Sequence, residues 1–376
     1  MMTASFRLSR NVLLFSLLAI CARLEQTHSF ALMPTPTPSS TQCLAKKSAG
    51  GGGGFGAAPK LAPKTPSKQA VAKRIQKKYG GTSSEDIARG TQQQIEKAMA
   101  SLPPHLQAAT QLYQQLQKWN SRISSMSVLD QTKIPTQDME GARRAKDELD
   151  RIYQEFDLTE NDIHNIFQKT TWDASADAKT ARALTGKMPK EIEDRIDNAC
   201  SIVADAVKAA GKDGTCLDVG CGFGVLVPYL TKAGVDQKQI YGIDLSTDMI
   251  RNAEEFYPGA SFEEADFFAY EPNAGIDGFD AIILCSTLHD LPDSVGALKK
   301  AASLLRPEGK LIIVHAQGAS HVKKQVSANP VLVKRGLPDA DELRELDTGL
   351  TLVVEPAGAN SREESFQGYL AVLQKK

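Results

Sequence analysis

The chain has 376 residues, of which 41% are hydrophobic and 24% are charged. This length and composition can bury a sizeable core and exclude a collagen, a mostly disordered chain, a polytopic membrane protein and a small disulfide scaffold. The net charge of −1 is unevenly placed, because residues 1–84 carry 12 basic residues and one acid, which leaves residues 85–376 with a net charge of −12. An acidic body argues against a nucleic-acid partner.

Residues 1–29 have the pattern of a secretory signal peptide. Basic residues precede the apolar run 11–22, and small residues at Thr27 and Ser29 offer a cleavage point before Phe30. The run is too short to cross a bilayer as a helix. No later stretch approaches about 18 apolar residues, so we expect no transmembrane segment in the mature protein.

Residues 30–84 have the composition of a transit peptide or disordered linker. They contain nine Lys and Arg, no Asp or Glu, many Ser, Thr and Pro, and a run of glycines at 50–54. Together with the signal, and with Phe30 first after the cleavage point, they resemble the bipartite plastid-targeting presequence of algae with complex, heterokont-type plastids. The resemblance implies a plastid location, and the secretory pathway is the alternative.

Residues 85–188 are expected to form a helical N-terminal region, because apolar side chains recur there at helical spacing. The pair Pro103–Pro104 should separate two helices. Thr159 and Asp162 have the spacing of a capping box at the start of another helix. Pro189 suits the first position of a further helix, which should end at Gly211.

From Thr215 onward, short β-branched runs alternate with helical stretches. We expect strands at Thr215–Val219, Ile240–Ile243, Ala281–Cys285, Lys310–Val314, Leu350–Glu355 and Phe366–Leu373, with helices at 246–256, 294–305 and 338–347. A third strand should precede Asp266. The alternation predicts an α/β fold with a doubly wound, mostly parallel, seven-stranded Rossmann-like sheet, preceded by the helical extension or lid.

A glycine-rich loop follows the first predicted strand. Gly220, Gly222 and Gly224 lie in the stretch DVGCGFG, where they would allow a tight turn and a close approach of the backbone to a ligand. The dinucleotide fingerprint would need a third glycine at position 225, which is Val225. Asp218 precedes the loop, and a carboxylate at this position favours a cationic ligand over a phosphate.

Two further acids follow the next two strands. Asp244 ends the second strand, where it could hold both hydroxyls of a ribose, and Asp266 follows the third. Three carboxylates around a glycine loop suit a nucleoside that carries an amine and a positive charge.

This combination resembles the class I S-adenosylmethionine-dependent methyltransferases. The stretch LDVGCGFG is similar to the first motif of that family, residues 279–293 to its fourth-strand motif, and residues 304–314 to its fifth-strand motif. The resemblance extends from Ile192 to Lys376. It implies a class I methyltransferase domain over residues 189–376, with S-adenosyl-L-methionine as cofactor and S-adenosyl-L-homocysteine as product.

The resemblance also implies roles for individual residues. Asp218 and the three loop glycines would hold the methionine part of the cofactor, with loop amides meeting its carboxylate at a helix N-terminus. The other implied cofactor contacts are Asp244 to the ribose, Leu245 and Met249 beside the adenine, Asp266 to the adenine amine, Phe267 through its N–H or ring, and Cys285 and Ser286 near the sulfonium. A purely structural place in the core is the alternative for Met249, Phe267 and Cys285.

Methyl transfer from a sulfonium mainly needs alignment and exclusion of water, and a base is required only where the acceptor must lose a proton. His289 and His315 are the candidate catalytic bases, because they follow the fourth and fifth strands; packing is the alternative for both. His321 and Asp290 are more distant options. Trp172 could close over the cofactor or serve as a packing residue.

The acceptor is expected to be a small molecule, such as a plastid quinone. Methylation of nucleic-acid bases usually requires an Asn/Asp-Pro-Pro-aromatic tetrad after the fourth strand, where this chain has Cys285–Leu288. No CxxC pair is present, so we expect neither a metal site nor a disulfide framework. The sequence leaves the acceptor and the oligomeric state open.

Three rival functions remain. The chief alternative is a non-catalytic methyltransferase-fold scaffold that binds partners through its N-terminal helices. A nicotinamide-dependent oxidoreductase is disfavoured by Val225 and by the lack of a Tyr-x-x-x-Lys pair in the body. The third is transfer of another group, such as aminopropyl, from the same type of cofactor.

Overall fold

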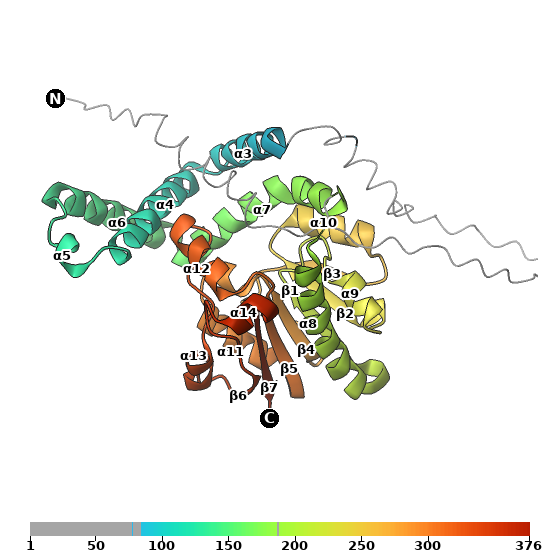
Figure 1. Cartoon of the computed structure of the whole chain (residues 1–376). Helices are drawn as coiled ribbons and strands as arrows, with labels where there is room; N and C mark the ends of the chain where they lie inside the picture. The colour runs from blue at the N-terminus through green and yellow to red at the C-terminus, as the bar shows by residue number, and fades with distance from the viewer. Residues whose placement is uncertain (1–76, 78–83, 186–187) are drawn as a thin grey trace, which may run out of the picture.

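The computed structural model describes residues 77, 84–185 and 188–376 (Figure 1). The predicted signal peptide and the predicted transit segment, apart from Lys77 and Ser84, lie outside these residues. Within the described ranges, no helix is both long enough and apolar enough to span a bilayer.

A seven-stranded sheet forms the centre of the fold, in the order β3-β2-β1-β4-β5-β7-β6. The strands are β1 Cys216–Val219, β2 Ile240–Asp244, β3 Ser261–Glu264, β4 Phe279–Cys285, β5 Leu305–His315, β6 Leu350–Val354 and β7 Tyr369–Lys375. Strands β1 to β5 pair in parallel, and β7 lies antiparallel between β5 and β6. This arrangement confirms the predicted mostly parallel, Rossmann-like sheet. The strand order reverses between β1 and β4, and ligands of such sheets bind at the carboxyl ends of the strands at this switch point.

Both faces of the sheet are covered, because neighbouring side chains of the central strands point to opposite sides. Ile283 and Ile312 pack with one set of helices, namely α8 Lys190–Ala209, α9 Val227–Lys232 and α10 Thr247–Phe256. Ile282 and Ile313 pack on the other face, against α11 Ser294–Leu304 and α13 Ala340–Glu345. Burial on both sides explains the near-continuous apolar runs in the sequence.

Two helices were not predicted, and both alter the C-terminal part. One is α12 Ala319–Ala328; the other is α14 Arg362–Gln367, which contains Phe366, the residue at which a strand was expected to begin. Ser361 Oγ accepts a hydrogen bond from the Glu364 N–H (3.0 Å) and caps α14. Gly368 ends it with a φ of 66°, so β7 begins only at Tyr369.

The helical extension consists of α3 Ser84–Ala100, α4 Pro104–Ser124, α5 Val128–Gln131, α6 Thr136–Phe156 and α7 Glu160–Thr185. The break at Pro103–Pro104 and the capping box before α7 are confirmed. The Thr159 N–H donates to Asp162 Oδ2 (2.7 Å), and the Asp162 N–H donates to Thr159 Oγ1 (3.2 Å). In Figure 1, α4, α5 and α6 project beyond the sheet, whereas α7 crosses above it.

The extension shares a core with the sheet domain. Tyr113 of α4 and Phe167 of α7 are buried in the same cluster as Val322 of α12 and the segment Val331–Val333. Because residues from both parts close this core, the extension is fixed against the carboxyl edge of the sheet.

Candidate active site

The glycine loop after β1 requires glycine for two different reasons. Gly220 and Gly224 have φ values of 70° and 81°, which residues other than glycine rarely adopt. A Cβ on Gly220 would lie 2.5 Å from the Thr287 side chain, and a Cβ on Gly224 would lie 2.7 Å from the Tyr257 ring. The loop is therefore packed directly against the segment that follows β4.

The amides of the three loop glycines form hydrogen bonds within the protein. Gly220 N–H donates to the Ile243 carbonyl (2.8 Å), Gly222 N–H to Asp244 Oδ2 (2.9 Å) and Gly224 N–H to the Cys221 carbonyl (3.0 Å). We expected these amides to receive the methionine carboxylate of the cofactor. The tight turn engages these three amides within the protein, and contact of the loop with the methionine carboxylate stays a prediction.

Asp218 is a buried carboxylate inside β1, with 3% of the residue exposed. Burial, reinforced by the nearby Asp244 charge, raises the pKa of Asp218 to about 8. A carboxylate in this environment is stabilised in its charged form by a cation placed against it. A cationic ligand placed against Asp218 would therefore favour its charged form, and this role of Asp218 stays a prediction.

Asp244 ends β2 and holds the loop in place. Its Oδ2 accepts from the Gly222 N–H, and its Oδ1 accepts from the Ser246 N–H (both 2.9 Å). Burial raises the pKa of Asp244, while these two hydrogen bonds and the charge of Lys179 act in the opposite direction. Each carboxylate oxygen keeps a second lone pair, so Asp244 can still accept from the hydroxyls of a ribose.

Asp266 follows β3 and is oriented by the helical extension. Its Oδ2 accepts from Asn165 Nδ2 of α7 (2.8 Å), and its Oδ1 accepts from the Phe268 N–H (3.0 Å). The neighbouring Phe267 packs its ring into the core cluster of the α11 face. Its backbone N–H is therefore the group it would offer to an adenine.

The other predicted cofactor contacts lie around the same edge. Met249 is buried in the core cluster of the α10 face, whereas Leu245 is half-buried and accepts from Lys169 Nζ through its carbonyl (2.9 Å). Cys285 and Ser286 are half-buried at the tip of β4. Burial raises the pKa of Cys285 to about 12, which excludes a thiolate nucleophile at neutral pH.

Helix α7 crosses the carboxyl ends of β2 and β3 and is tied to them by polar contacts. Lys169 Nζ lies 2.6 Å from Glu264 Oε1 at the end of β3. Asp173 Oδ1 accepts from Ser246 Oγ (2.7 Å), at the N-terminus of α10. Together with Asn165, these residues position α7 over the edge that carries Asp244 and Asp266.

Lys179 and Trp172 of α7 contact each other. Lys179 Nζ lies 3.3 Å from the centroid of the Trp172 ring, a cation–π contact. The Lys179 charge also opposes the rise in the pKa of both Asp244 and Asp290 that burial causes. The charge of Lys179 thus acts on two site carboxylates, and this role was not predicted because α7 lies far from the motifs along the chain.

The two predicted bases, His289 and His315, lie side by side, with ring centroids 5.1 Å apart. His321 of α12 stacks on His315 at 5.7 Å, so it is closer than the sequence predicted. His289 Nε2 lies 3.5 Å from Asp290 Oδ1. Within the described chain, no group of His, Cys, Asp and Glu has the arrangement of a metal site.

A buried polar network joins the extension to the His289–Asp290 segment. His164 Nε2 donates to the Asp290 carbonyl (2.8 Å), so its Nδ1 accepts from the Tyr113 hydroxyl (2.9 Å). Lys334 Nζ donates to the same hydroxyl (2.9 Å), and burial lowers the pKa of His164 to about 4. The network was missed in the sequence because its members are far apart along the chain.

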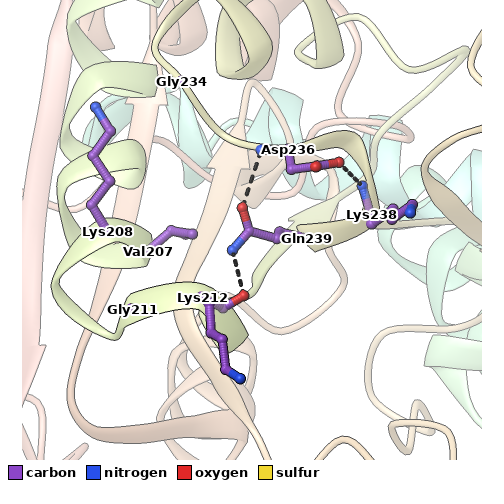
Figure 2. A pocket seen from close by; sticks show the side chains of 8 residues that line it. All are labelled: Val207, Lys208, Gly211, Lys212, Gly234, Asp236, Lys238 and Gln239. Atoms are coloured by element: carbon purple, nitrogen blue, oxygen red, sulfur yellow. Dashed lines mark hydrogen bonds between the residues drawn. The ribbon is translucent and has the colours of Figure 1, made fainter.

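A separate surface pocket of about 300 Å³ lies at the other end of β2 (Figure 2). Gln239, which directly precedes β2, lines it and donates to the Gly214 carbonyl (2.8 Å). The charged residues that line the pocket are Lys208, Lys212, Asp236 and Lys238. This pocket is at the end of the strand opposite Asp244 and is not part of the candidate active site.

Comparison with known proteins agrees with this geometry. Residues 210–357 match a family model described as "Methyltransferase domain". This part of the chain is therefore similar to methyltransferase domains. Its mostly parallel sheet and its glycine loop agree with the predicted resemblance to S-adenosylmethionine-dependent enzymes, and so does the predicted cofactor.

Curated relatives match parts of this chain. The trans-aconitate 2-methyltransferase of Afipia carboxidovorans is 34% identical over 133 residues, which cover 34% of this chain and 49% of the relative. The ubiquinone biosynthesis O-methyltransferase of Actinobacillus pleuropneumoniae is 30% identical over 102 residues, covering 25% and 42%. The chain thus spans about half, or less, of the length of these relatives.

A solved structure of similar fold is the plantazolicin methyltransferase BpumL, in complex with a pentazolic desmethylPZN analog and S-adenosylhomocysteine. It is 17% identical to this chain, with a TM-score of 0.37, over 49% of this chain and 85% of BpumL.

Proposed function

We propose that this protein transfers a methyl group from S-adenosylmethionine to a small-molecule acceptor. The observation that carries the proposal is the placement of Asp218, Asp244 and Asp266 at the carboxyl ends of three adjacent strands of a methyltransferase domain. When bound, the cofactor supplies an activated methyl group on a positively charged sulfur. The protein then contributes alignment and exclusion of water, which helix α7 serves by covering this edge.

The relatives support a small-molecule acceptor. The names of the two curated relatives refer to trans-aconitate and to ubiquinone biosynthesis. The acidic body of the chain argues in the same direction, since it would repel a phosphate backbone. Within this function, Asp244 binds the ribose hydroxyls, Asp266 accepts from the adenine amine, and Asp218 faces the cationic part of the cofactor.

Lys179 is the group proposed to bind the methionine carboxylate. The amides of the three loop glycines are engaged within the protein, and the charge of Lys179 on α7 acts on both Asp244 and Asp290. An ammonium that neutralises a carboxylate in a partly buried site forms a charge-assisted hydrogen bond, stronger than a neutral one.

Calorimetric titration of the full chain tests both statements. S-adenosylhomocysteine should bind the wild type, and Lys179→Met should weaken that binding about tenfold, the effect of one charge-assisted hydrogen bond. Binding of 5′-methylthioadenosine, which lacks the amino-acid part, should not change, and Lys190→Met, an exposed lysine of α8, is the control. Absence of S-adenosylhomocysteine binding to the wild type contradicts the proposed function. An equal loss for both ligands contradicts only the role of Lys179.

We further propose a plastid location, so that the acceptor is a plastid metabolite. The support is compositional: a signal-like segment, a basic acid-free segment, and Phe30 at their junction. The full chain with a C-terminal fluorescent protein should accumulate in plastids of a heterokont alga, and Phe30→Ala should divert it. Secretion of both proteins alike contradicts the plastid location and favours the secretory pathway.

A further inference from the structure

Three imidazole rings meet beside the proposed methyl-donor site. They come from three different elements: His289 from the 3-10 turn Leu288–Asp290, His315 from the end of β5 and His321 from α12. The ring centroids are 5.1 Å apart for the first pair and 5.7 Å for the second. Because the three rings come from separate elements, the fold brings them together, and the cluster is a candidate binding site rather than a feature of one sequence segment.

One nitrogen of each ring is buried without a hydrogen-bond partner among the described residues. These atoms are His289 Nδ1, His315 Nδ1 and His321 Nε2. Gln325 lies one turn after His321 on α12, and its buried Oε1 also has no hydrogen-bond partner among the described residues. Buried polar groups in native proteins are nearly always paired, because an unpaired one costs free energy. Several such atoms in one region indicate that a polar ligand completes them.

The cluster adjoins the glycine loop. Strands β4 and β5 pair up to Cys285 and Val314, so the residues after them emerge at the same edge. Thr287, two residues before His289, packs against Gly220 so closely that a Cβ there would overlap it. A ligand held by the histidines therefore lies at the carboxyl edge of β4 and β5, next to the loop proposed to hold the cofactor.

We propose that His289, His315 and His321 bind the hydroxyl group of a phenol-type acceptor, and that His289 removes its proton. The proposal rests on the proposed function and names its acceptor class. Asp290, 3.5 Å from His289 Nε2, orients the ring and leaves Nδ1 for the acceptor. As the proton moves to His289 Nδ1, the acceptor oxygen bonds to the methyl carbon and the carbon–sulfur bond breaks with its electron pair going to sulfur. The imidazolium then returns the proton to water.

The electrostatics of the cluster favour a neutral hydroxyl over a carboxylate. Burial lowers the pKa of His315 and of His321, and the positive charges of the neighbouring histidines act in the same direction. His315 and His321 are therefore neutral near pH 7 and present no fixed positive charge to an anion. The Asp290 carboxylate would repel an anionic acceptor, whereas it stabilises the imidazolium formed when a hydroxyl loses its proton.

The test uses chromophoric probes with the full chain saturated with S-adenosylhomocysteine. The probe 4-nitrocatechol changes colour when its hydroxyl ionises, so binding at a base gives a difference spectrum. We expect this spectrum with the wild type and a loss of affinity of about tenfold or more in both His289→Gln and His315→Gln. His321→Gln, at a half-buried helical position that tolerates the exchange, should show a smaller loss. His105→Gln, in α4, is the control.

The outcomes separate this proposal from the proposed function. Wild-type affinity in both His289→Gln and His315→Gln, or preferential binding of 4-nitrobenzoate or benzylamine over the catechol, overturns the hydroxyl site. Unchanged S-adenosylhomocysteine affinity in the variants shows that a loss of catechol binding is local. A wild type that binds the catechol through these histidines but does not bind S-adenosylhomocysteine overturns the proposed function and leaves the hydroxyl site standing.

Discussion

Binding of S-adenosylhomocysteine at pH 7 should release about one proton from Asp218. In the ligand-free chain burial raises the pKa of this carboxyl to about 8, so most of the molecules carry the proton at pH 7. The ammonium of the bound amino-acid part favours the ionised form and returns the pKa to a lower value. Ligand binding and proton release are then coupled.

Calorimetry in buffers of different ionisation enthalpy measures this proton. The observed enthalpy should vary with the buffer for the wild type, and Asp218→Asn should abolish that variation. Asp205→Asn, on the exposed face of α8, should behave as the wild type. An enthalpy that is independent of the buffer in the wild type would show that Asp218 does not face the cationic part of the ligand.

The same carboxyl gives the ligand-free chain a defined pH dependence. Its folded pKa, about 8, lies above the ordinary value of 3.8. The folded state therefore binds the proton more tightly than the unfolded state, and the resulting stabilisation is lost as the pH rises between these two values. The contribution of Asp218 to the free energy of unfolding should thus be smaller at pH 8 than at pH 5, and Asp218→Asn should remove this difference.

The sheet and the acidic residues around the glycine loop could be predicted from the sequence because they depend on local signals. Asp218 lies within β1, Asp244 ends β2 and Asp266 follows β3, and parallel strands bring their carboxyl ends to one edge. The pair His289 and His315 was found in the same way, since β4 and β5 are neighbours. The apolar pattern of the strands and the positions of these residues along the chain were enough to predict that they lie at one edge.

The parts that were missed depend on contacts between distant segments. Asn165 reaches Asp266 across about a hundred residues, and Lys179 comes to the site only because α7 crosses the edge of the sheet. His321 lies on α12, a helix with a glycine before it and no side-chain cap to indicate its start. The hydrogen bonds of the loop amides were also missed. The tight turn directs some of them to the Ile243 carbonyl, and no local sequence pattern specifies that partner.

Substitution of Asp244 by alanine should weaken S-adenosylhomocysteine binding by about 1.5–3 kcal/mol, or roughly ten- to a hundred-fold. The carboxylate has two tasks, because it would accept from the ribose hydroxyls and it fixes the loop through Gly222 and Ser246. Asp248→Ala, at the first turn of α10, removes a contact with Arg251 at the surface and serves as the matched control.

Comparing ligands separates the two tasks of Asp244. Adenosine and 2′,3′-dideoxyadenosine share the base and differ in the hydroxyls, so the wild type should prefer adenosine and Asp244→Ala should bind both equally weakly. If Asp244→Ala keeps the full preference, the carboxylate acts only on the loop and the ribose assignment is wrong. If its dissociation constant for S-adenosylhomocysteine equals that of the wild type, the cofactor does not bind at this edge of the sheet.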